Sequence, residues 1–360
     1  MASGSGTIVM KKILVCPLDW GLGHATRCIP VIGELQKKRA EIIIASSGEA
    51  LQLLRQEFPE LAFFELPSYR PVYPEIKSML FEMLTQLPRF MRVIKEEHAV
   101  TEKIVREQKI DLVISDNRYG CWSAIVKSVF ITHQLKILMP RGMGWASPGI
   151  NFLNRRCIQK FGNVWIPDQP GSGLTTPFIS KHVPNQSYIG WLSRFQARNE
   201  IEQKYEIIAL VSGPEPQRTI FQKIMLTQLL KNNLKSLLVA GEPGKPYHKQ
   251  EGCVEIVNHL PSRDLEQAIL SSRIVISRSG YSTVMDLIAL GKKAVFIPTP
   301  QQPEQIFFAR YFKENHIAFS EDQPKFSVSL ALEKSDEFKG FGHFKMEDRY
   351  LVNAIESILE

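Results

Sequence analysis

Short apolar segments alternate with helical patterns along both halves of this chain. In the first half, the expected strands cover 13–16, 41–45, 62–66, 112–115 and 129–132, and the expected helices 25–38, 50–56, 76–106 and 122–127. The strands are nearly continuous in apolar residues, as in sheets that are covered on both faces. Strands of this kind separated by helices predict an α/β fold with a parallel sheet.

The second half repeats the pattern. Its expected strands cover 207–211, 236–240, 254–257, 274–276 and 294–297, and its expected helices 217–230, 262–270, 281–290 and 304–313. The chain has 360 residues, which is typical of two domains. The segments 167–173 and 194–204 indicate the crossing between them. We therefore expect Rossmann-like domains at 10–190 and 191–345, and a last helix at 346–360 that packs on either domain.

The net charge and the cysteines narrow the possible classes of protein. A formal net charge of +7 favours anionic ligands or an anionic membrane surface. Lys and Arg occur only in small groups, so we expect no nucleic-acid partner. The five cysteines are scattered and lack C-x-x-C spacing, which favours a reducing compartment without a zinc site. We expect a cytoplasmic protein, at most peripheral to the inner face of the membrane.

A polar turn and helix follow the apolar strand at 274–276. Such a turn leaves backbone N–H groups free at the positive end of the helix dipole, where a phosphate can bind. Four polar residues then share one helix face by their spacing, namely Ser279, Ser282, Thr283 and Asp286. Hydroxyls near the helix start suit a diphosphate, and a carboxylate two turns on suits a ribose diol. The segment therefore predicts a nucleotide-sugar site.

Each half also carries a glycine-containing loop after its first strand. In the first half, Gly21 and Gly23 let the backbone approach a ligand, and His24 can act as a base at the helix entrance. The third glycine of a dinucleotide fingerprint is absent. In the second half, Ser212 and Gly213 open a helix in the same way. Two such units would face each other across a cleft.

These motifs resemble glycosyltransferases of the GT-B fold, in particular the MurG-like group of glycosyltransferase family 28. Arg278, Ser279 and Gly280, followed by Thr283, Val284 and Asp286, match the family's R-S-G-x-x-T-V-x-E stretch, with Asp in place of Glu. The loop Gly21–His24 matches the family's first Gly/His loop. The resemblance spans both halves, although its specific motifs are short.

The resemblance implies a site for a UDP-sugar in the C-terminal domain. By it, Ser279, Gly280 and Thr283 would contact the diphosphate, Asp286 the ribose, and Gln305 the donor sugar or phosphate. The full set of expected donor-binding residues is Gly21, Gly23, Ser212, Gly213, Arg278, Ser279, Gly280, Ser282, Thr283, Asp286, Gln302 and Gln305. The segment 212–216 departs from the family because it is rich in proline where MurG-like enzymes have a Gly-Gly-Ser loop.

Asp116 is expected at the carboxyl end of its strand, with Trp122 following. This resembles the S-D…W segment of plant-type UDP-glycosyltransferases, in which the aspartate supports the early histidine. We infer a His24–Asp116 dyad in which the carboxylate orients the imidazole. His24 would deprotonate the acceptor hydroxyl, and single displacement would invert the anomeric configuration. No D-x-D motif is present, so we expect no metal and no cofactor besides the UDP-sugar as co-substrate.

Several alternatives stay open at this point. The pattern from Gly21 to Arg27 also resembles the G-x-G-H-x-x-R loop of the UDP-sugar hydrolase of pseudaminic acid synthesis, and a non-catalytic nucleotide-sugar sensor is a third hypothesis. The acceptor could be a saccharide, a lipid-linked molecule or a small molecule. The long helical segment 76–106 carries an apolar stripe with a basic flank. It is either a core-facing helix or a surface that contacts the membrane.

Overall fold

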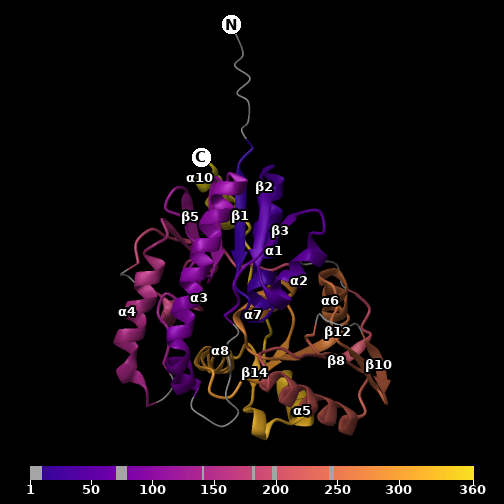
Figure 1. The fold of residues 1–360 in the computed structure, drawn as a ribbon. Helices are drawn as coiled ribbons and strands as arrows, with labels where there is room; N and C mark the ends of the chain where they lie inside the picture. The colour runs from indigo at the N-terminus through magenta and orange to yellow at the C-terminus, as the bar shows by residue number, and fades with distance from the viewer. Residues whose placement is uncertain (1–9, 70–78, 140–141, 181–182, 197–200, 243–246) are drawn as a thin grey trace.

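Two seven-stranded sheets form the centres of the two halves of the chain (Figure 1). The computed structural model describes residues 10–69, 79–139, 142–180, 183–196, 201–242 and 247–360; the side chains of 79–84 lie outside this description. The first sheet has the strand order β3-β2-β1-β4-β5-β6-β7, and the second has the order β10-β11-β9-β8-β12-β13-β14.

The first half holds the expected strands and some that the sequence analysis did not identify. Its elements are β1 (Lys12–Pro17), α1 (Gly23–Lys37), β2 (Glu41–Ser46), α2 (Gly48–Glu57), β3 (Ala62–Glu65), α3 (Met79–Gln108), β4 (Leu112–Asp116), β5 (Lys127–Ile131), η1 (Gly144–Ala146), α4 (Ser147–Ile158), β6 (Asn163–Ile166), η2 (Thr176–Phe178) and β7 (Gln186–Tyr188). All pairs in this sheet are parallel, as expected.

The second half follows the same plan. Its elements are β8 (Tyr205–Leu210), α5 (Gln217–Asn232), β9 (Ser236–Val239), β10 (His248–Glu251), β11 (Val254–Val257), α6 (Ser262–Leu270), β12 (Ser272–Ser277), α7 (Tyr281–Leu290), β13 (Ala294–Phe296), α8 (Pro303–Glu314), β14 (Phe319–Ser320), η3 (Gln323–Lys325), α9 (Val328–Ser335) and α10 (Arg349–Leu359). Its pairs are parallel except for β10, which runs antiparallel to β11.

The predicted helix at 122–127 is wrong. These residues form an irregular segment that leads into β5. The Ser123 amide donates to Ser128 Oγ, and the Ile125 amide donates to Ser123 Oγ. Serine hydroxyls here take the bonds that a helix would make within its backbone. The ring of Trp122 stacks on that of His98 at 4.0 Å, which holds the segment against α3.

In both sheets the strand order reverses at the position where ligands bind in doubly wound folds. In the first sheet the reversal lies between β1 and β4, so the loop with His24 comes beside Asp116. In the second it lies between β8 and β12, so the loop after Leu210 comes beside the turn at Ser279. The topology therefore gathers the predicted site residues at the carboxyl ends of the strands.

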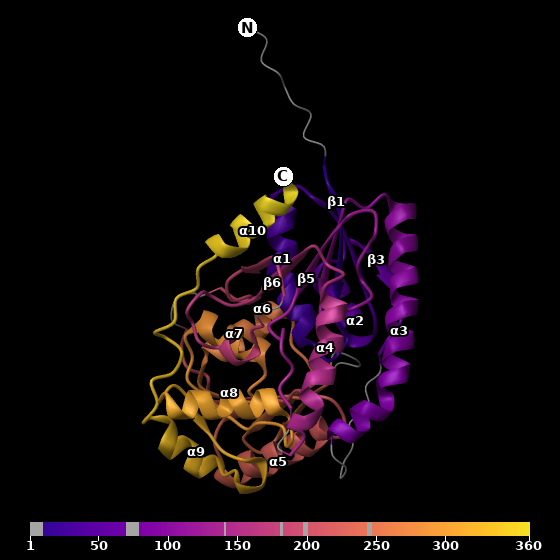
Figure 2. The same cartoon turned by 90° about the vertical axis from the view of Figure 1, so that its left-hand side faces the viewer.

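One buried apolar cluster runs through both halves. It contains Val15 and Ile114 of the first sheet as well as Phe296 of the second, and Tyr281 and Met285 of α7 lie within it. The last helix, α10, contacts α1 of the N-terminal half (Figure 2). No helix among the described residues is both long and apolar enough to cross a bilayer.

The described part of α3 packs mainly on the N-terminal core. Val93 is buried, and Phe90 and Ile94 contact a small cluster around Leu18 and Tyr69. This supports the core-facing interpretation of the apolar stripe for the residues with described side chains. The stripe's first members, Met79, Leu80, Met83 and Leu84, lie outside that description.

Candidate functional site

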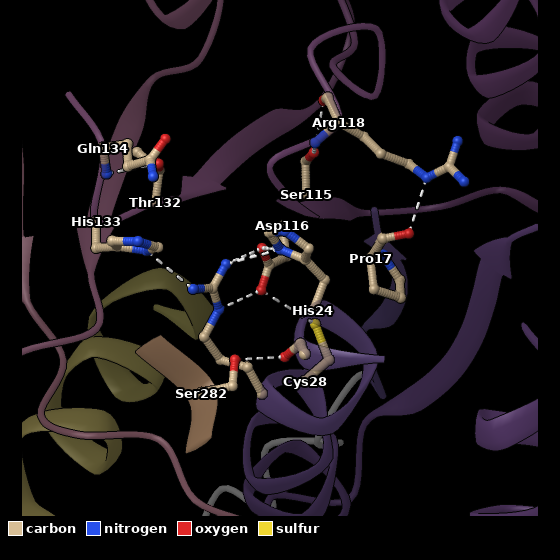
Figure 3. A network of polar contacts seen from close by, with 12 residues as sticks. Pro17, His24, Cys28, Ser115, Asp116, Arg118, Thr132, His133, Gln134 and Ser282 are labelled. Atoms are coloured by element: carbon tan, nitrogen blue, oxygen red, sulfur yellow. Dashed lines mark hydrogen bonds and ion pairs between the residues drawn. The ribbon is translucent and has the colours of Figure 1, made fainter. Parts of the chain in front are cut away.

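The loop between β1 and α1 presents His24 at the start of the helix. Gly21 has φ of +76°, a conformation that a residue with a side chain rarely adopts, and the chain then enters α1 at Gly23. His24 Nδ1 lies 2.8 Å from Asp116 Oδ1 at the end of β4 (Figure 3). The predicted dyad thus forms a direct hydrogen bond across the reversal point of the sheet.

The guanidinium of Arg27 holds the same carboxylate. Arg27 lies one helical turn after His24, and its Nε donates to Asp116 Oδ2 at 2.7 Å while a terminal nitrogen donates to Oδ1. Arg27 is 2% exposed and Asp116 is fully buried. The sequence analysis noted Arg27 only as part of a resemblance. The signal available was its spacing, because residues three apart share a helix face.

These charges set the protonation states of the dyad. Burial would raise the pKa of Asp116, but the charges of Arg27 and His24 hold that pKa well below its usual range. Burial lowers the pKa of His24 below 6.5, against the opposing effect of Asp116. His24 is therefore neutral at neutral pH. Its Nδ1 lies 2.8 Å from Asp116 Oδ1 and 2.9 Å from a terminal nitrogen of Arg27, and the tautomer that donates from Nδ1 to the carboxylate leaves His24 Nε2 without a proton. Its Nε2 makes no hydrogen bond to any described residue and is free to accept a proton.

The turn before α7 is open in the way that anion binding requires. No side chain caps the first N–H groups of this helix. A Cβ built on Gly280 would meet nothing nearer than Thr283 Oγ1 at 4.0 Å. Neither φ nor packing demands glycine there, so the missing side chain leaves free space over the helix N-terminus. Within α7, Ser282, Thr283 and Asp286 are partly exposed while the residues between them are buried, as the spacing predicted.

The three hydroxyls of this segment differ in their partners. Ser279 is fully buried and donates to the Gln305 carbonyl at 2.8 Å. Ser282 reaches across to the other half and donates to the Gly23 carbonyl at 2.8 Å (Figure 3). Thr283 Oγ1 has no hydrogen-bond partner among the described residues. Thr283 is consequently the hydroxyl best placed to meet a diphosphate.

Arg278 points away from this surface. It is 1% exposed; one terminal nitrogen donates to the carbonyls of Ile297 and Pro298, and the other donates to Gln323 Oε1 at 2.6 Å. Its guanidinium lies 4.0 Å above the ring of Phe221. Burial lowers its pKa to about 9. The sequence analysis expected a contact with the nucleotide, whereas the structure gives this side chain a role in joining strand ends inside the C-terminal half.

Asp286 lies against the segment that joins the halves. Its Oδ1 accepts from Ser193 Oγ at 2.7 Å, and its Oδ2 lies 3.8 Å from Arg194 Nε. Burial raises its pKa to about 6, because Arg194 is too distant to compensate fully. The carboxylate is 14% exposed and can accept further hydrogen bonds.

The remaining predicted donor residues lie around this turn. Gln302 Oε1 accepts from the Gln305 amide, and Gln305 Oε1 accepts from the Thr299 amide, so both side chains shape the start of α8. Ser212 and Gly213 are exposed after β8. Gly23 requires its small size, since a Cβ there would lie 2.9 Å from Ser282 Oγ.

A polar bridge joins the two halves beside the dyad. His133, which follows β5, lies 3.1 Å from Glu304 through Nε2 and 3.1 Å from Arg27 through Nδ1. Gln134 also donates to Glu304. Burial would raise the pKa of Glu304, but His133 and Arg27 lower it. The sequence analysis did not predict this bridge, because its partners are remote in the chain.

A second contact supports the bridge. The ring of Tyr281 stacks on that of His133 at 4.1 Å, and its hydroxyl donates to the Pro167 carbonyl at 2.7 Å. The carboxyl ends of the two sheets therefore face each other through α7 and α8. Among the described residues, no group of three or more His, Cys, Asp or Glu could hold a metal ion.

Residues 225–335 match the glycosyltransferase family 28 C-terminal domain. An uncharacterized glycosyltransferase of Methanosarcina mazei is 24% identical over 87% of this chain and 84% of its own. A second relative is the UDP-N-acetylglucosamine--N-acetylmuramyl-(pentapeptide) pyrophosphoryl-undecaprenol N-acetylglucosamine transferase of Clostridium tetani. It is 21% identical over 97% of this chain and 94% of its own length. The crystal structure of Acinetobacter baumannii MurG superposes with a TM-score of 0.57 at 13% identity, covering 96% of this chain and 99% of that one. The GT-B fold and the resemblance to MurG-like glycosyltransferases are thereby confirmed.

Proposed function

We propose that this chain is an inverting glycosyltransferase that moves a sugar from a UDP-sugar to an acceptor hydroxyl, with His24 as the base. The observation that carries the proposal is the arrangement around His24. Its Nδ1 is held by Asp116, its Nε2 is free, and the next residue toward the N-terminus, Gly23, touches Ser282 in the first turn of α7. A base and an anion-binding helix start therefore meet at one place.

The reaction follows from these positions. His24 Nε2 takes the proton of the acceptor hydroxyl while that oxygen attacks the anomeric carbon. The bond from this carbon to the diphosphate oxygen breaks on the opposite side, so the configuration inverts and UDP leaves with the electron pair. Asp116 accepts the Nδ1 proton in a hydrogen bond and stabilises the imidazolium that forms.

The donor would bind on the open turn of the C-terminal half. The free N–H groups of α7 and the hydroxyl of Thr283 stabilise the leaving diphosphate, as helix N-termini do for developing negative charge. Asp286 would accept hydrogen bonds from the ribose diol. Since the helix supplies the electrostatic stabilisation, we propose that the reaction needs no metal. UDP is proposed as the nucleotide because the Clostridium tetani relative carries it in its donor's name.

Calorimetric titration with UDP, ADP and TDP tests the donor site. We expect selective binding of UDP, and we expect Asp286→Ala to weaken it. Asp264→Ala serves as the matched control, because Asp264 is an exposed carboxylate in the first turn of α6. If none of the three diphosphates binds, the donor-site proposal fails.

Two alternatives give different products. A hydrolase would release free sugar from a UDP-sugar at the same rate with or without acceptor, and a sensor would bind UDP-sugar without turnover. Neither is favoured, since the relatives that span nearly the whole chain carry the names of glycosyltransferases. Product analysis of UDP-sugar incubations with saccharide, lipid-linked and small-molecule acceptors separates the three.

A further inference from the structure

Buried polar atoms without hydrogen bonds gather in the two loops that flank His24 and Asp116. Folded proteins pair nearly all of their buried polar groups, so an unpaired one needs an explanation. Among the described residues up to 190, four side chains hold such an atom. One is Glu102 on α3, with Arg106 at 3.8 Å. The other three atoms are Asp19 Oδ1, Trp20 Nε1 and Asn117 Oδ1. We call these three residues the polar loop cluster.

The polar loop cluster lies at the carboxyl edge of the first sheet. Asp19 and Trp20 belong to the loop between β1 and α1, and Asn117 directly follows β4. The two strands are neighbours at the reversal point of the sheet, where ligands bind in doubly wound folds. The Leu18 amide donates to the Asp116 carbonyl at 2.9 Å. The two loops therefore start side by side at the dyad.

Arg118 lies near Asp19 without donating to its free oxygen. Asp19 Oδ2 accepts from Ser47 Oγ at 2.9 Å and from Ser68 Oγ, whereas Oδ1 accepts no hydrogen bond. Arg118 approaches Oδ1 to 3.4 Å, but its nitrogens donate to Pro17, Pro67, Glu97 and Ser47 (Figure 3). The Asp19 side chain is only 4% exposed. A carboxylate oxygen in this position gains from a hydroxyl donor.

Trp20 and Asn117 add one donor and one acceptor. The ring centre of Trp20 lies 6.0 Å from that of Tyr69 at an angle of 89°, and 5.7 Å from that of Phe90. These contacts hold the indole in place while its Nε1 stays unbonded. Asn117 has φ of +59°, a left-handed conformation that asparagine tolerates better than most residues. Both residues are half-buried, so their side chains also border solvent.

The first loop leaves room next to the base. Gly21 lies between Trp20 and His24 and is exposed. A Cβ built on Gly21 would meet nothing within 4 Å. A small ring bound to the polar loop cluster would therefore extend along this backbone toward His24 without displacing a side chain at Gly21.

We propose that the polar loop cluster is the acceptor subsite and that it takes a neutral saccharide. A sugar hydroxyl both donates and accepts, so neighbouring hydroxyls of one ring would pair with Asp19, Trp20 and Asn117. A diphosphate offers only acceptor oxygens, and the carboxylate of Asp19 would repel it. The inference rests on the proposed function, because it names the class of acceptor whose hydroxyl His24 deprotonates.

Saturation-transfer NMR of the full chain, with and without UDP, tests the subsite. The probes are the methyl pyranosides of glucose, galactose, mannose and N-acetylglucosamine, with geranyl diphosphate as the anionic comparison. We expect at least one glycoside to bind, and geranyl diphosphate not to compete with it when UDP is present. Trp20→Phe removes the indole N–H and keeps an aromatic ring, and Asn117→Gly removes the amide at a φ that glycine adopts readily. Each variant should weaken glycoside binding about fivefold, as expected for one lost hydrogen bond.

Two control variants make the same changes elsewhere. Trp122→Phe alters another half-buried ring that packs on α3, where it stacks on His98. Asn233→Gly replaces another asparagine of positive φ, at the end of α5. Both should bind the glycoside like the wild type. The proposal is overturned if no glycoside binds, if Trp20→Phe and Asn117→Gly bind it no more weakly than the controls do, or if geranyl diphosphate displaces it.

The UDP titration of the same variants keeps the two proposals apart. Because the polar loop cluster belongs to the N-terminal half, Trp20→Phe and Asn117→Gly should bind UDP like the wild type. UDP binding without glycoside binding would remove the subsite and leave the donor site standing. Glycoside binding that both variants weaken, without any UDP binding, would remove the donor site and leave the saccharide subsite.

Discussion

Two aspartates, one in each half, have opposite electrostatic environments. Asp116 accepts two hydrogen bonds from Arg27 and contacts His24, and its pKa lies well below its usual range. Asp286 has a serine hydroxyl at 2.7 Å and an arginine nitrogen only at 3.8 Å, and burial raises its pKa to about 6. Cationic groups inside the protein compensate the negative charge of Asp116, whereas the charge of Asp286 is only partly compensated.

This difference separates a residue that orients a catalytic group from one that can receive a ligand. A paired carboxylate holds its neighbours in one geometry, which is what a histidine base requires. A carboxylate with spare acceptor capacity gains from hydroxyl donors such as a ribose diol. The predictions below test the two halves separately.

Asp116→Asn should have the largest effect, because it leaves the buried guanidinium of Arg27 without its counter-charge. Removing one partner of a buried ion pair costs about 3–5 kcal/mol. Denaturant unfolding at neutral pH measures this loss, and Asp264→Asn on the surface should stay within about 0.5 kcal/mol of the wild type. A loss as small as that of the control would show that Arg27 finds another partner.

His24→Gln should abolish most of the transfer while leaving the donor site intact. Loss of a general base reduces the rate about 10²- to 10⁴-fold, whereas UDP affinity should stay unchanged. In the wild type, kcat/KM should rise with pH through the pKa of His24, which lies below 6.5, and should then level off near neutral pH. A variant that retains wild-type turnover would exclude His24 as the base.

Asp286 should make the folded state lose stability as the pH rises. Its pKa is 3.8 in the unfolded chain and about 6 in the folded one, so the folded state binds the extra proton between these values. The contribution is complete below pH 3.8 and is lost as the pH rises through about 6. At about 1.4 kcal/mol per pKa unit, Asp286→Asn should gain roughly 3 kcal/mol relative to the wild type between pH 4 and pH 7. A difference that does not change with pH would contradict the raised pKa.

Thr283→Val and Ser279→Ala should act on different quantities, although both remove a hydroxyl of the same motif. Thr283→Val should weaken UDP binding about tenfold by losing a hydrogen bond to an anion. Ser279→Ala should instead lower the free energy of unfolding by about 1 kcal/mol, because the Gln305 carbonyl loses the Ser279 hydroxyl as a donor. If Ser279→Ala weakens UDP binding more than Thr283→Val, the assignment of the two hydroxyls is reversed.

The sequence determined the parts of this protein that depend on local pattern. Continuous apolar strands separated by helices predicted two sheets whose pairs are parallel except for that of β10 with β11, and Gly280 with the polar spacing of α7 predicted the open turn. His24 and Asp116 followed from their places after β1 and at the end of β4, because parallel strands bring their carboxyl ends to one edge. The helix expected at 122–127 failed where side-chain hydroxyls of serine replaced helical hydrogen bonds.

Only the tertiary structure decided which partner each polar group has. Arg278 and Ser279 belong to a motif that suggests ligand contact, yet their side chains turn inward to carbonyls of other segments. Arg27 pairs with a residue 89 positions away, and His133 with one 171 positions away. The spacing of residues along the chain sets the face of an element on which a side chain lies. What lies opposite that face depends on how distant elements pack.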